Sequence, residues 1–305
     1  MRNCQRCVRN KSGIVRFMKA LIVINAYVKN ESQISQAQRI AEELEKLNVN
    51  CDIVRNLNLA IIKDGKTVAA NYDFCVFLDK DKACARLLEK SGIKLYNSAQ
   101  AIEICDDKML THIALANCSI PMPNTVCAPL CYYEDAEINY DFLNFVKSSL
   151  GFPLVAKKCY GSVGNGVYLI KSFTELEKFE NENKLIAHLY QKFIGKGGED
   201  IRVLVIGGKY LCSMKRKNSG DFRSNIELGG HGEKYFADDK LINLCEKVAC
   251  ILNLDYCGID ILTDEKGNYY VCEVNSNAFF REAERVCGVN IAKKYTEFII
   301  TAKNA

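Results

Sequence analysis

The chain has 305 residues, of which 49% are hydrophobic and 26% are charged, as is typical of globular proteins. No apolar run approaches the roughly 20 residues that a membrane-spanning helix needs, so no membrane partner is expected. The formal net charge of +4 is set by the first 17 residues, because from Met18 onward 36 basic residues face 37 acidic ones. That balance argues against a nucleic-acid-binding surface.

Residues 1–17 form a basic leader without a single acidic residue. Such a composition resembles a transit peptide, although the leader lacks the continuous apolar core of a secretory signal. Since "MKALIVINAY" reads as the beginning of a first strand at Met18, we expect the leader to be flexible or a misassigned extension. Its Cys4-x-x-Cys7 pair has no second pair, so a zinc or redox site is not expected there.

The sixteen cysteines do not have the pattern of a disulfide framework. Several lie inside apolar runs, where a free cysteine behaves as a small hydrophobic residue. Because no secretion signal accompanies them, we expect reduced thiols and a cytoplasmic location. The cysteines inside apolar runs are Cys75, Cys212, Cys250, Cys257 and Cys272.

Residues 18–97 alternate between strand and helix patterns. "KALIVINAY" predicts a first strand, and "SQISQAQRIAEELEKLNV" repeats apolar residues at helical spacing. Short strands near "CDIVRN" and "YDFCVFLD", a helix "DKACARLLEKSG" and a strand "IKLYN" follow. This alternation predicts a small parallel α/β domain. No glycine-rich fingerprint follows the first strand, so it is not an obvious dinucleotide site.

Residues 98–190 form a bridge and a second unit. Two helices are predicted first, the second opening at Asp106-Asp107-Lys108, before an exit marked by Pro121 and Pro123. After a helix "YDFLNFVKSSLG", the strands "FPLVAKK" and "VYLIKS" flank the glycine loop "CYGSVGNG". A helix "FTELEKFENE" and a strand "IAHLYQKFI" complete this unit.

The chain is rich in strands from about residue 200. "DIRVLVIGGKYLCSMKRK" predicts a hairpin turning at Gly207-Gly208. After a polar loop, the helix "DDKLINLCEKVACILNL" leads into a second hairpin, "YCGIDILTDEKGNYYVCEVN". With Lys266-Gly267 as the turn of that hairpin, Asp260 and Glu273 fall opposite each other.

The last hairpin places two acids and an amide on one face. Glu273 and Asn275 stand two residues apart and therefore share a face of the strand. Asp260 lies on the same face, because it is opposite Glu273 in the hairpin. Such carboxylates repel unless a positive group sits between them, and Mg²⁺ held by carboxylates and substrate phosphates is a common solution. A solvated sheet face is the alternative. The residues predicted on the opposite, apolar face are Ile259, Ile261, Cys272 and Val274.

The glycine loop "GSVGNG" contains Gly161, Gly164 and Gly166. It is no Walker P-loop, because the Gly-Lys-Ser/Thr ending and the following helix are missing. As a flap it would present backbone N–H groups to phosphate oxygens, and Lys157 just upstream would place an ammonium group beside them. A hairpin with a long glycine turn is the alternative.

A third candidate is the basic stretch "KRKNSGDFRSN", residues 215–225. It carries Lys215, Arg216, Lys217 and Arg223 next to small polar residues. No aromatic stacking platform accompanies it, so an anion clamp for phosphate or carboxylate fits better than a nucleic-acid site. A solvated loop is the remaining alternative.

Together and in this order, these motifs resemble the ATP-grasp superfamily, and within it the RimK-like glutamate ligases. The resemblance runs from about Asp106 to the C-terminus and is strongest in "GGEDIRVLVIGG", "GDFRSNIELGG", "CGIDIL" and "CEVNSN". It implies an α/β fold of the α+β grasp type, with a small amino-terminal α/β domain at 18–97 and a two-lobed ATP-grasp domain at 98–305. The lobes would cover about 98–190 and 191–305.

The resemblance also implies roles for individual residues. Lys108 and Lys157 would contact ATP phosphates, under a flap that contains Gly161, Ser162, Gly164 and Gly166. The adenine slot would be lined by Gln191, Lys192, Phe193 and Ile194, with Asp200 near the nucleotide. Arg223, Ser224 and Asn225 would reach the phosphates, and Arg223 with Arg216 would stabilise an acyl phosphate. Asp260, Glu273 and Asn275 would hold the metal, normally two Mg²⁺ ions, with Mn²⁺ as the alternative.

The implied activity is that of an ATP-dependent carboxylate–amine ligase, which adds glutamate or another amino acid to a small-molecule or peptide carboxylate through an acyl phosphate. Relatives often assemble, so a homo-oligomer is an open expectation. Two departures are visible: Lys192 stands where the family usually has glutamate, and "NSNAFF" replaces an "EVNxSPG"-like continuation. They leave a non-catalytic ATP-binding regulatory module as the alternative and predict a change of substrate near residues 276–281.

Overall fold

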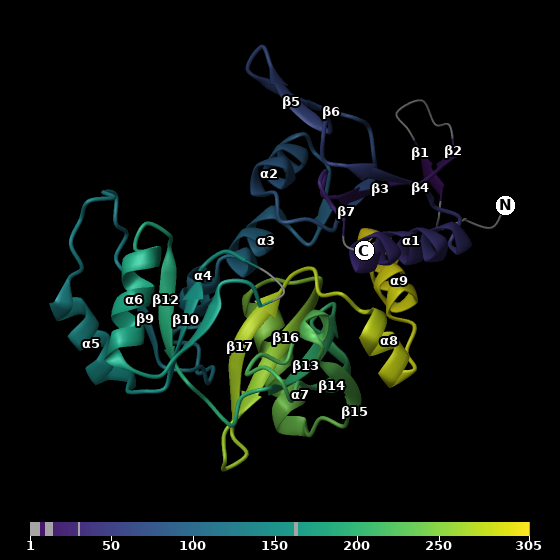
Figure 1. Ribbon diagram of the computed structural model, residues 1–305. Coiled ribbons are helices and arrows are strands. Elements are labelled where there is room, and N and C mark those ends of the chain that lie inside the picture. The colour runs from purple at the N-terminus through teal and green to yellow at the C-terminus, as the bar shows by residue number, and fades with distance from the viewer. Residues whose placement is uncertain (1–6, 10–14, 30, 162–163, 305) are drawn as a thin grey trace.

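The chain folds into three sheet-based parts with a mixed α/β architecture, as the sequence predicts (Figure 1). The computed structural model describes residues 7–9, 15–29, 31–161 and 164–304. Within these residues, no helix combines the length and the apolar character that crossing a membrane requires. Two short strands, β1 (Cys7–Arg9) and β2 (Val15–Phe17), pair within the predicted leader, whereas Cys4 lies outside the described residues.

The amino-terminal part is built on a parallel four-stranded sheet in the order β4-β3-β7-β8, which confirms the predicted βαβ alternation. Its central strand is almost fully buried, as expected when both faces of a parallel sheet are covered. Its elements are β3 (Lys19–Ile24), α1 (Glu31–Lys46), β4 (Asn50–Arg55), β5 (Ala60–Lys63), β6 (Lys66–Ala69), β7 (Phe74–Phe77), α2 (Lys82–Lys90) and β8 (Leu95–Tyr96).

The projecting hairpin β5–β6 is absent from the sequence prediction. Its strands are joined by Asp64 and Gly65, which have positive φ angles of 50° and 72°. Asp-Gly is a strong signal for such a two-residue turn, so the sequence did contain the information.

The next part is an antiparallel four-stranded sheet in the order β11-β10-β12-β9. Two helices connect it to the amino-terminal part, and the second begins where Asp107 caps the backbone N–H groups of Met109 and Leu110. The elements are α3 (Ala99–Asp106), α4 (Lys108–Leu115), β9 (Thr125–Cys127), α5 (Tyr140–Leu150), β10 (Leu154–Lys158), β11 (Val167–Ile170), α6 (Phe173–Asn183) and β12 (His188–Lys192). All except β9 agree with predicted elements.

The largest sheet is antiparallel, with five strands in the order β15-β14-β13-β16-β17. The predicted turn at Gly207-Gly208 is confirmed, and its φ angles of 57° and 73° favour glycine at both positions. One face of the sheet packs on α7 in an apolar core, and the other carries charged residues at one end. The elements are β13 (Glu199–Ile206), β14 (Lys209–Lys217), the 3₁₀ turn Ile226–Leu228, β15 (His231–Tyr235), α7 (Asp239–Ile251), β16 (Tyr256–Thr263) and β17 (Tyr269–Asn275).

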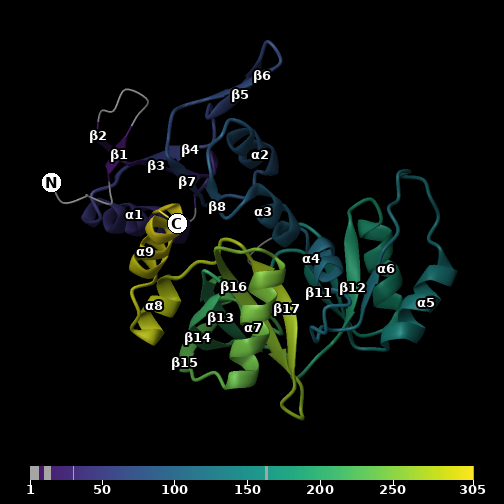
Figure 2. The same cartoon turned by 180° about the vertical axis from the view of Figure 1, so that it is seen from behind.

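Two helices that the sequence prediction did not include end the described chain: α8 (Arg281–Cys287) and α9 (Ile291–Asn304). Figures 1 and 2 both show α9 beside α1, so the carboxy-terminal helices return to the amino-terminal part. One hydrophobic core accordingly combines residues of α1 and β3 with Leu204, Tyr256 and Tyr295. The predicted domain division at residue 97 is not tested by this packing and stays a prediction.

Asn97 connects the amino-terminal part to the large sheet through side-chain hydrogen bonds. Its Nδ2 donates to the backbone carbonyls of Tyr256 and Ser276, both at 2.7 Å. Its Oδ1 accepts from the backbone N–H groups of Asp255 and Tyr256, at 2.6 and 3.1 Å. The side chain is only 2% exposed, so these four bonds satisfy a buried amide completely.

Candidate active site

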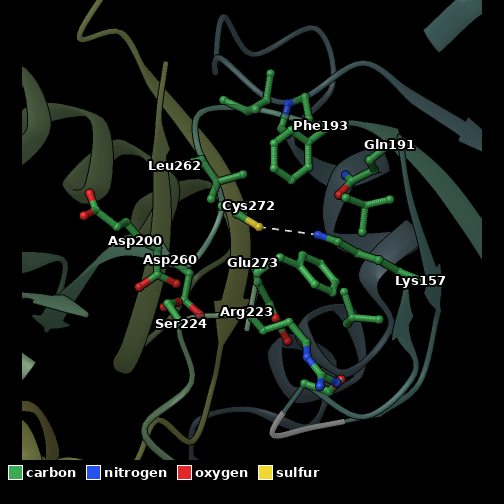
Figure 3. Close-up of a pocket in the computed structure, with 18 of the residues that line it drawn as sticks. Lys157, Gln191, Phe193, Asp200, Arg223, Ser224, Asp260, Leu262, Cys272 and Glu273 are labelled. Atoms are coloured by element: carbon green, nitrogen blue, oxygen red, sulfur yellow. Dashed lines mark hydrogen bonds between the residues drawn. The ribbon is translucent and has the colours of Figure 1, made fainter. Parts of the chain in front are cut away.

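A cleft of about 760 Å³ lies between the two antiparallel sheets (Figure 3). We call it the first chamber. One end is apolar and the other is charged, which suits a ligand with an aromatic base at one end and phosphates at the other. The apolar end is lined by Pro123, Val155, Val167, Phe193, Ile194, Phe222 and Leu262.

The segment 191–194 lies at the base of the apolar end. Gln191 is buried, with its Nε2 2.8 Å from Nε2 of His112 and 3.0 Å from Oγ1 of Thr125. Phe193 and Ile194 present apolar side chains to the chamber, and the exposed Lys192 also lines it. The structure thus brings together the four residues expected in an adenine slot.

Gly197 leaves room for two phenylalanine residues, Phe193 and Phe222, close to its backbone at this end. A Cβ atom at this position would lie 3.1 Å from Cζ of Phe193 and 3.4 Å from Cβ of Phe222, and the φ angle of +76° itself favours glycine. Phe222 was not predicted as a site residue, although it lies next to the predicted Arg223.

Two buried lysines reach the charged end from different elements. Lys157 lies on β10, and its Nζ donates a hydrogen bond to Sγ of Cys272 at 3.4 Å, drawn as a dashed line in Figure 3. Lys108 is the first residue of α4, and its Nζ lies 3.0 Å from the carbonyl oxygen of Gly161 and 3.7 Å from Oε1 of Glu273. The Lys108 ammonium group therefore lies between the glycine loop and the last hairpin, and the Lys157 ammonium group contacts the same hairpin.

The predicted place of Cys272 on the apolar face is wrong. Asp260 is paired with Glu273 as predicted, but Ile261 is paired with Val271, so the ladder is irregular between Asp260 and Ile261. The extra residue is Cys272, and at such a bulge two successive side chains can face one side of a sheet. Cys272 and Glu273 consequently both line the chamber, whereas the other three predicted residues, Ile259, Ile261 and Val274, do lie in the core.

The glycine loop touches the stretch 223–225 across the cleft. Arg223 donates from Nη1 to the carbonyl oxygen of Gly164 at 2.9 Å, and a Cβ at Gly164 would come within 3.1 Å of Oδ1 of Asn225. Gly161 and Gly166 also have positive φ angles, of 145° and 78°. Ser162 lies outside the described residues. The loop and the basic stretch, far apart in sequence, thus form one side of the charged end.

A row of charged side chains crosses three strands of the large sheet. Arg202 on β13 binds Asp260 on β16 through two hydrogen bonds, of 2.5 and 2.7 Å. Arg216 on β14 lies 2.9 Å from the same carboxylate and also pairs with Asp200, its Nε donating at 2.7 Å. Sequence reasoning missed Arg202; the signal was its position two residues after Asp200 in an otherwise apolar strand.

The charge states of this row follow from burial and pairing. Burial raises the pKa of Asp260, but Arg202 and Arg216 lower it by more, so the carboxyl stays ionised. Burial lowers the pKa of Arg216, and the carboxylates of Asp200 and Asp260 raise it well above its usual value. Asp260 and Arg216 therefore stay charged at neutral pH.

Asp260, Glu273 and Asn275 supply the oxygen ligands that Mg²⁺ takes. Within the described residues, no three His, Cys, Asp or Glu side chains form a preformed metal cluster, since the third ligand here is an amide. Nδ2 of Asn275 is buried without a hydrogen-bond partner among the described residues, which is unusual for a group with a purely structural role. The donor set fits Mg²⁺ if Asp260 exchanges one guanidinium contact for the ion.

A second chamber, of about 1090 Å³, lies beyond the charged row, against the amino-terminal part. Sequence reasoning did not predict it, because its walls come from segments far apart in the chain. The amino-terminal side chains lining it come from the ends of β3 and β7 and the start of α1, at the carboxyl edge of the parallel sheet. They are Asn25, Val28, Lys29, Gln33, Leu78, Asp79 and Lys80.

Comparisons with known proteins agree with this architecture. A family model described as the RimK-like ATP-grasp domain matches residues 105–299. N-acetylaspartylglutamate synthase A of Homo sapiens is 35% identical over 221 residues, which are 70% of this chain and 54% of that protein. Uncharacterized protein MG012 of Mycoplasma genitalium is 30% identical over 90% of this chain and 97% of its own. The solved RimK domain protein ATP-grasp from Sphaerobacter thermophilus has a similar fold, with a TM-score of 0.69 at 19% identity over 92% of this chain and 99% of that one.

Proposed function

The chain belongs to the RimK-like ATP-grasp family, and from this premise we propose that it is an ATP- and Mg²⁺-dependent ligase that joins a carboxylate to an amine through an acyl phosphate. Members of this family include ligases, and the ATP-grasp fold generally implies the use of ATP and a divalent metal. The single observation that supports the specific proposal is the wall between the two chambers. Four residues line both chambers, namely Arg216, Asn225, Asp260 and Glu273.

In this proposal ATP occupies the first chamber. Its adenine lies among the apolar residues that include Phe193 and Phe222, and its phosphates extend toward the charged end. Lys108 and Lys157 bind phosphate oxygens, because both are buried cations, one bonded to the glycine loop and the other lining the chamber. Gly164 and its neighbours cover the phosphates, which keeps water from the reacting group.

Asp260 and Glu273 at the shared wall, with Asn275 of the second chamber, would hold Mg²⁺. A bound Mg²⁺ would supply positive charge to offset that of the phosphates. The charged row keeps one of these ligands in place, since Arg202 and Arg216 orient the Asp260 carboxylate.

The second chamber takes the substrate carboxylate and then the amine. A carboxylate oxygen attacks the γ-phosphorus of ATP, and the bond to ADP breaks. Arg216 and Arg223 offset the charge of the acyl phosphate, and Arg216 is well placed because it lines both chambers. The amine nitrogen then attacks the carbonyl carbon, loses a proton and releases inorganic phosphate, which leaves an amide. An amino acid is the proposed amine, since the name of N-acetylaspartylglutamate synthase A describes a product that contains glutamate.

The proposal is tested by measuring ADP release with Mg-ATP, a panel of carboxylates and a panel of amino acids. We expect ADP formation that requires one member of each panel, with an amide product seen by mass spectrometry. Glu273→Ala should reduce it about 100- to 1000-fold, the typical cost of removing a group that stabilises transition-state charge. The matched control is Glu265→Ala, an exposed acid in the turn of the same hairpin.

Normal turnover in Glu273→Ala would contradict the metal assignment. Mg-ATP binding without ADP formation by any pair would favour a non-catalytic nucleotide-binding module instead.

A further inference from the structure

A buried amide of the amino-terminal part forms hydrogen bonds with residues 277 and 278, in one wall of the second chamber. Gln36, on α1, is 2% exposed, and its Nε2 lies 3.2 Å from the backbone carbonyl oxygen of Ala278 and 3.1 Å from Oδ1 of Asn277. A carbonyl oxygen can only accept a hydrogen bond, so the atom of Gln36 that faces Ala278 must be the NH₂ group. The orientation of the Gln36 amide is therefore fixed by chemistry, independently of any assignment of nitrogen and oxygen.

The orientation of the Gln36 amide also determines the orientation of the Asn277 amide. Because the NH₂ group of Gln36 also faces Asn277, the Asn277 atom that receives it must be Oδ1. The Nδ2 group of Asn277 is then left as a donor, and it has no hydrogen-bond partner among the residues that the structure describes. Asn277 itself is half-buried and lines the second chamber.

A cation faces the same chamber from the loop before α1. Lys29 lines it and is exposed, and across the described part of the chain its ammonium group has no ion pair. The acids nearby are already occupied: the Asp79 carboxylate accepts from the Nδ2 groups of Asn25 and Asn56, and Asp260 is bound by Arg202 and Arg216. The Asn277 Nδ2 group and the Lys29 ammonium group are thus unpaired donors that line the chamber, beside the buried Gln36 Oε1, an acceptor with no partner among the described residues.

We propose that Asn277 and Lys29 form a subsite for a carboxylate of the substrate that does not react, and that Gln36 is the positioning residue that keeps Asn277 turned to donate. The inference rests on the ligase function proposed above and adds a specificity determinant to it. One donor comes from the segment after the metal-binding strand and the other from the amino-terminal part. Substrate choice would accordingly depend on how these two parts are joined.

The test measures dissociation constants by calorimetry on the full chain, with and without Mg²⁺ and a non-hydrolysable ATP analogue. The probes are three acids, each paired with its half-amide: L-glutamate with L-glutamine, L-aspartate with L-asparagine, and succinate with succinamate. We expect the wild type to bind at least one acid about 10-fold more tightly than its half-amide, since a hydrogen bond to a charged group is worth about that factor.

Three variants separate the roles. Asn277→Asp should abolish the preference for the acid, because a carboxylate would then face a carboxylate. Lys29→Gln should reduce it about fivefold, as expected for an exposed charge. Gln36→Leu should reduce it by a similar factor without affecting nucleotide binding, because Asn277 is then free to rotate. Gln38→Leu, an exposed glutamine on the same helix, is the matched control and should behave as the wild type.

A wild type that binds none of the acids better than its half-amide would overturn the subsite, as would an unchanged preference in Asn277→Asp. If that variant does not fold, Asn277→Ala takes its place, and an unchanged preference there has the same meaning. Failure of the wild type to bind Mg-ATP would instead contradict the proposed ligase. The two failures are distinguishable, because the acid–amide comparison is also made without nucleotide.

Discussion

The two chambers of the cleft are constructed differently. The first is enclosed by strands and loops of the two antiparallel sheets, within residues 123–273, and its binding groups sit on recognisable local motifs. Beside the charged row, the second is lined by three distant segments, around residues 25–33, 78–80 and 273–279, which meet only because the amino-terminal part docks on the large sheet. Nucleotide binding should therefore tolerate changes in that docking, whereas substrate binding should not. The charged row between the chambers should matter to both.

The largest effect is expected where the chambers meet. Asp260→Asn removes the negative partner of two buried guanidinium groups, Arg202 and Arg216. Breaking a buried ion pair in this way typically costs about 3–5 kcal/mol of unfolding free energy. Urea unfolding measures that loss, and calorimetry should show weaker binding of both Mg-nucleotide and substrate.

The control for this prediction is Glu265→Gln in the exposed turn of the same hairpin, which should change the stability by less than about 0.5 kcal/mol. If Asp260→Asn weakened the binding of one ligand alone, the shared wall would not serve both chambers.

A somewhat smaller effect is expected from a buried histidine behind the first chamber. Burial and, secondarily, Lys157 lower the pKa of His112 to about 4. In the unfolded chain the pKa is about 6.5, so between these values the unfolded state binds the proton and the folded state does not. The His112 contribution to stability is thus complete above pH 6.5 and is lost as the pH falls toward 4, by about 3 kcal/mol in total.

This pH dependence is measured as the difference in unfolding free energy between the wild type and His112→Gln, at several values from pH 4 to 7. The difference should become smaller toward low pH, since only the wild type loses this contribution. His231→Gln, at an exposed histidine, is the matched control and should keep the slope of the wild type. An unchanged slope in His112→Gln would show that His112 takes up its proton equally in both states.

The smallest expected effect distinguishes the two chambers most directly. Phe222→Ala removes an aromatic ring from the apolar end of the first chamber and leaves the second untouched. Loss of part of a buried aromatic contact should weaken nucleotide binding about 10-fold, with substrate binding in the absence of nucleotide unchanged. Phe236→Ala, at a side chain 80% exposed, is the control. Equal losses for both ligands would mean that the chambers are not independent.

The elements and the charged motifs could be predicted from the sequence because they are local. The pairing of Asp260 with Glu273 follows from a short turn, and the two glycines at 207–208 mark the preceding hairpin. The bulge at Cys272 was not predicted, because the shift in alternation that it causes, from Val271 to Val274 on the same face, is obscured by an apolar residue at the bulge itself.

The second chamber could not be predicted for another reason. Gln36 meets Asn277, and Asn97 meets Tyr256, across sequence separations of 241 and 159 residues. Nothing in the pattern around Gln36 distinguishes a buried polar anchor from a surface glutamine on an amphipathic helix. The helices α8 and α9 were missed as well, although their positions decide where α1 lies.

The shared core of the amino-terminal sheet and the carboxy-terminal helices has a consequence for biosynthesis. A ribosome releases β3 and α1 long before Tyr295 and Ile299 of α9, yet these residues share one apolar core. β3 and α1 therefore remain with an uncovered apolar surface until α9 has been made. Such a delay favours chaperone binding or aggregation over independent folding of the nascent segment. Removal of α9 should accordingly destabilise the packing of β3 and α1 before that of the other sheets.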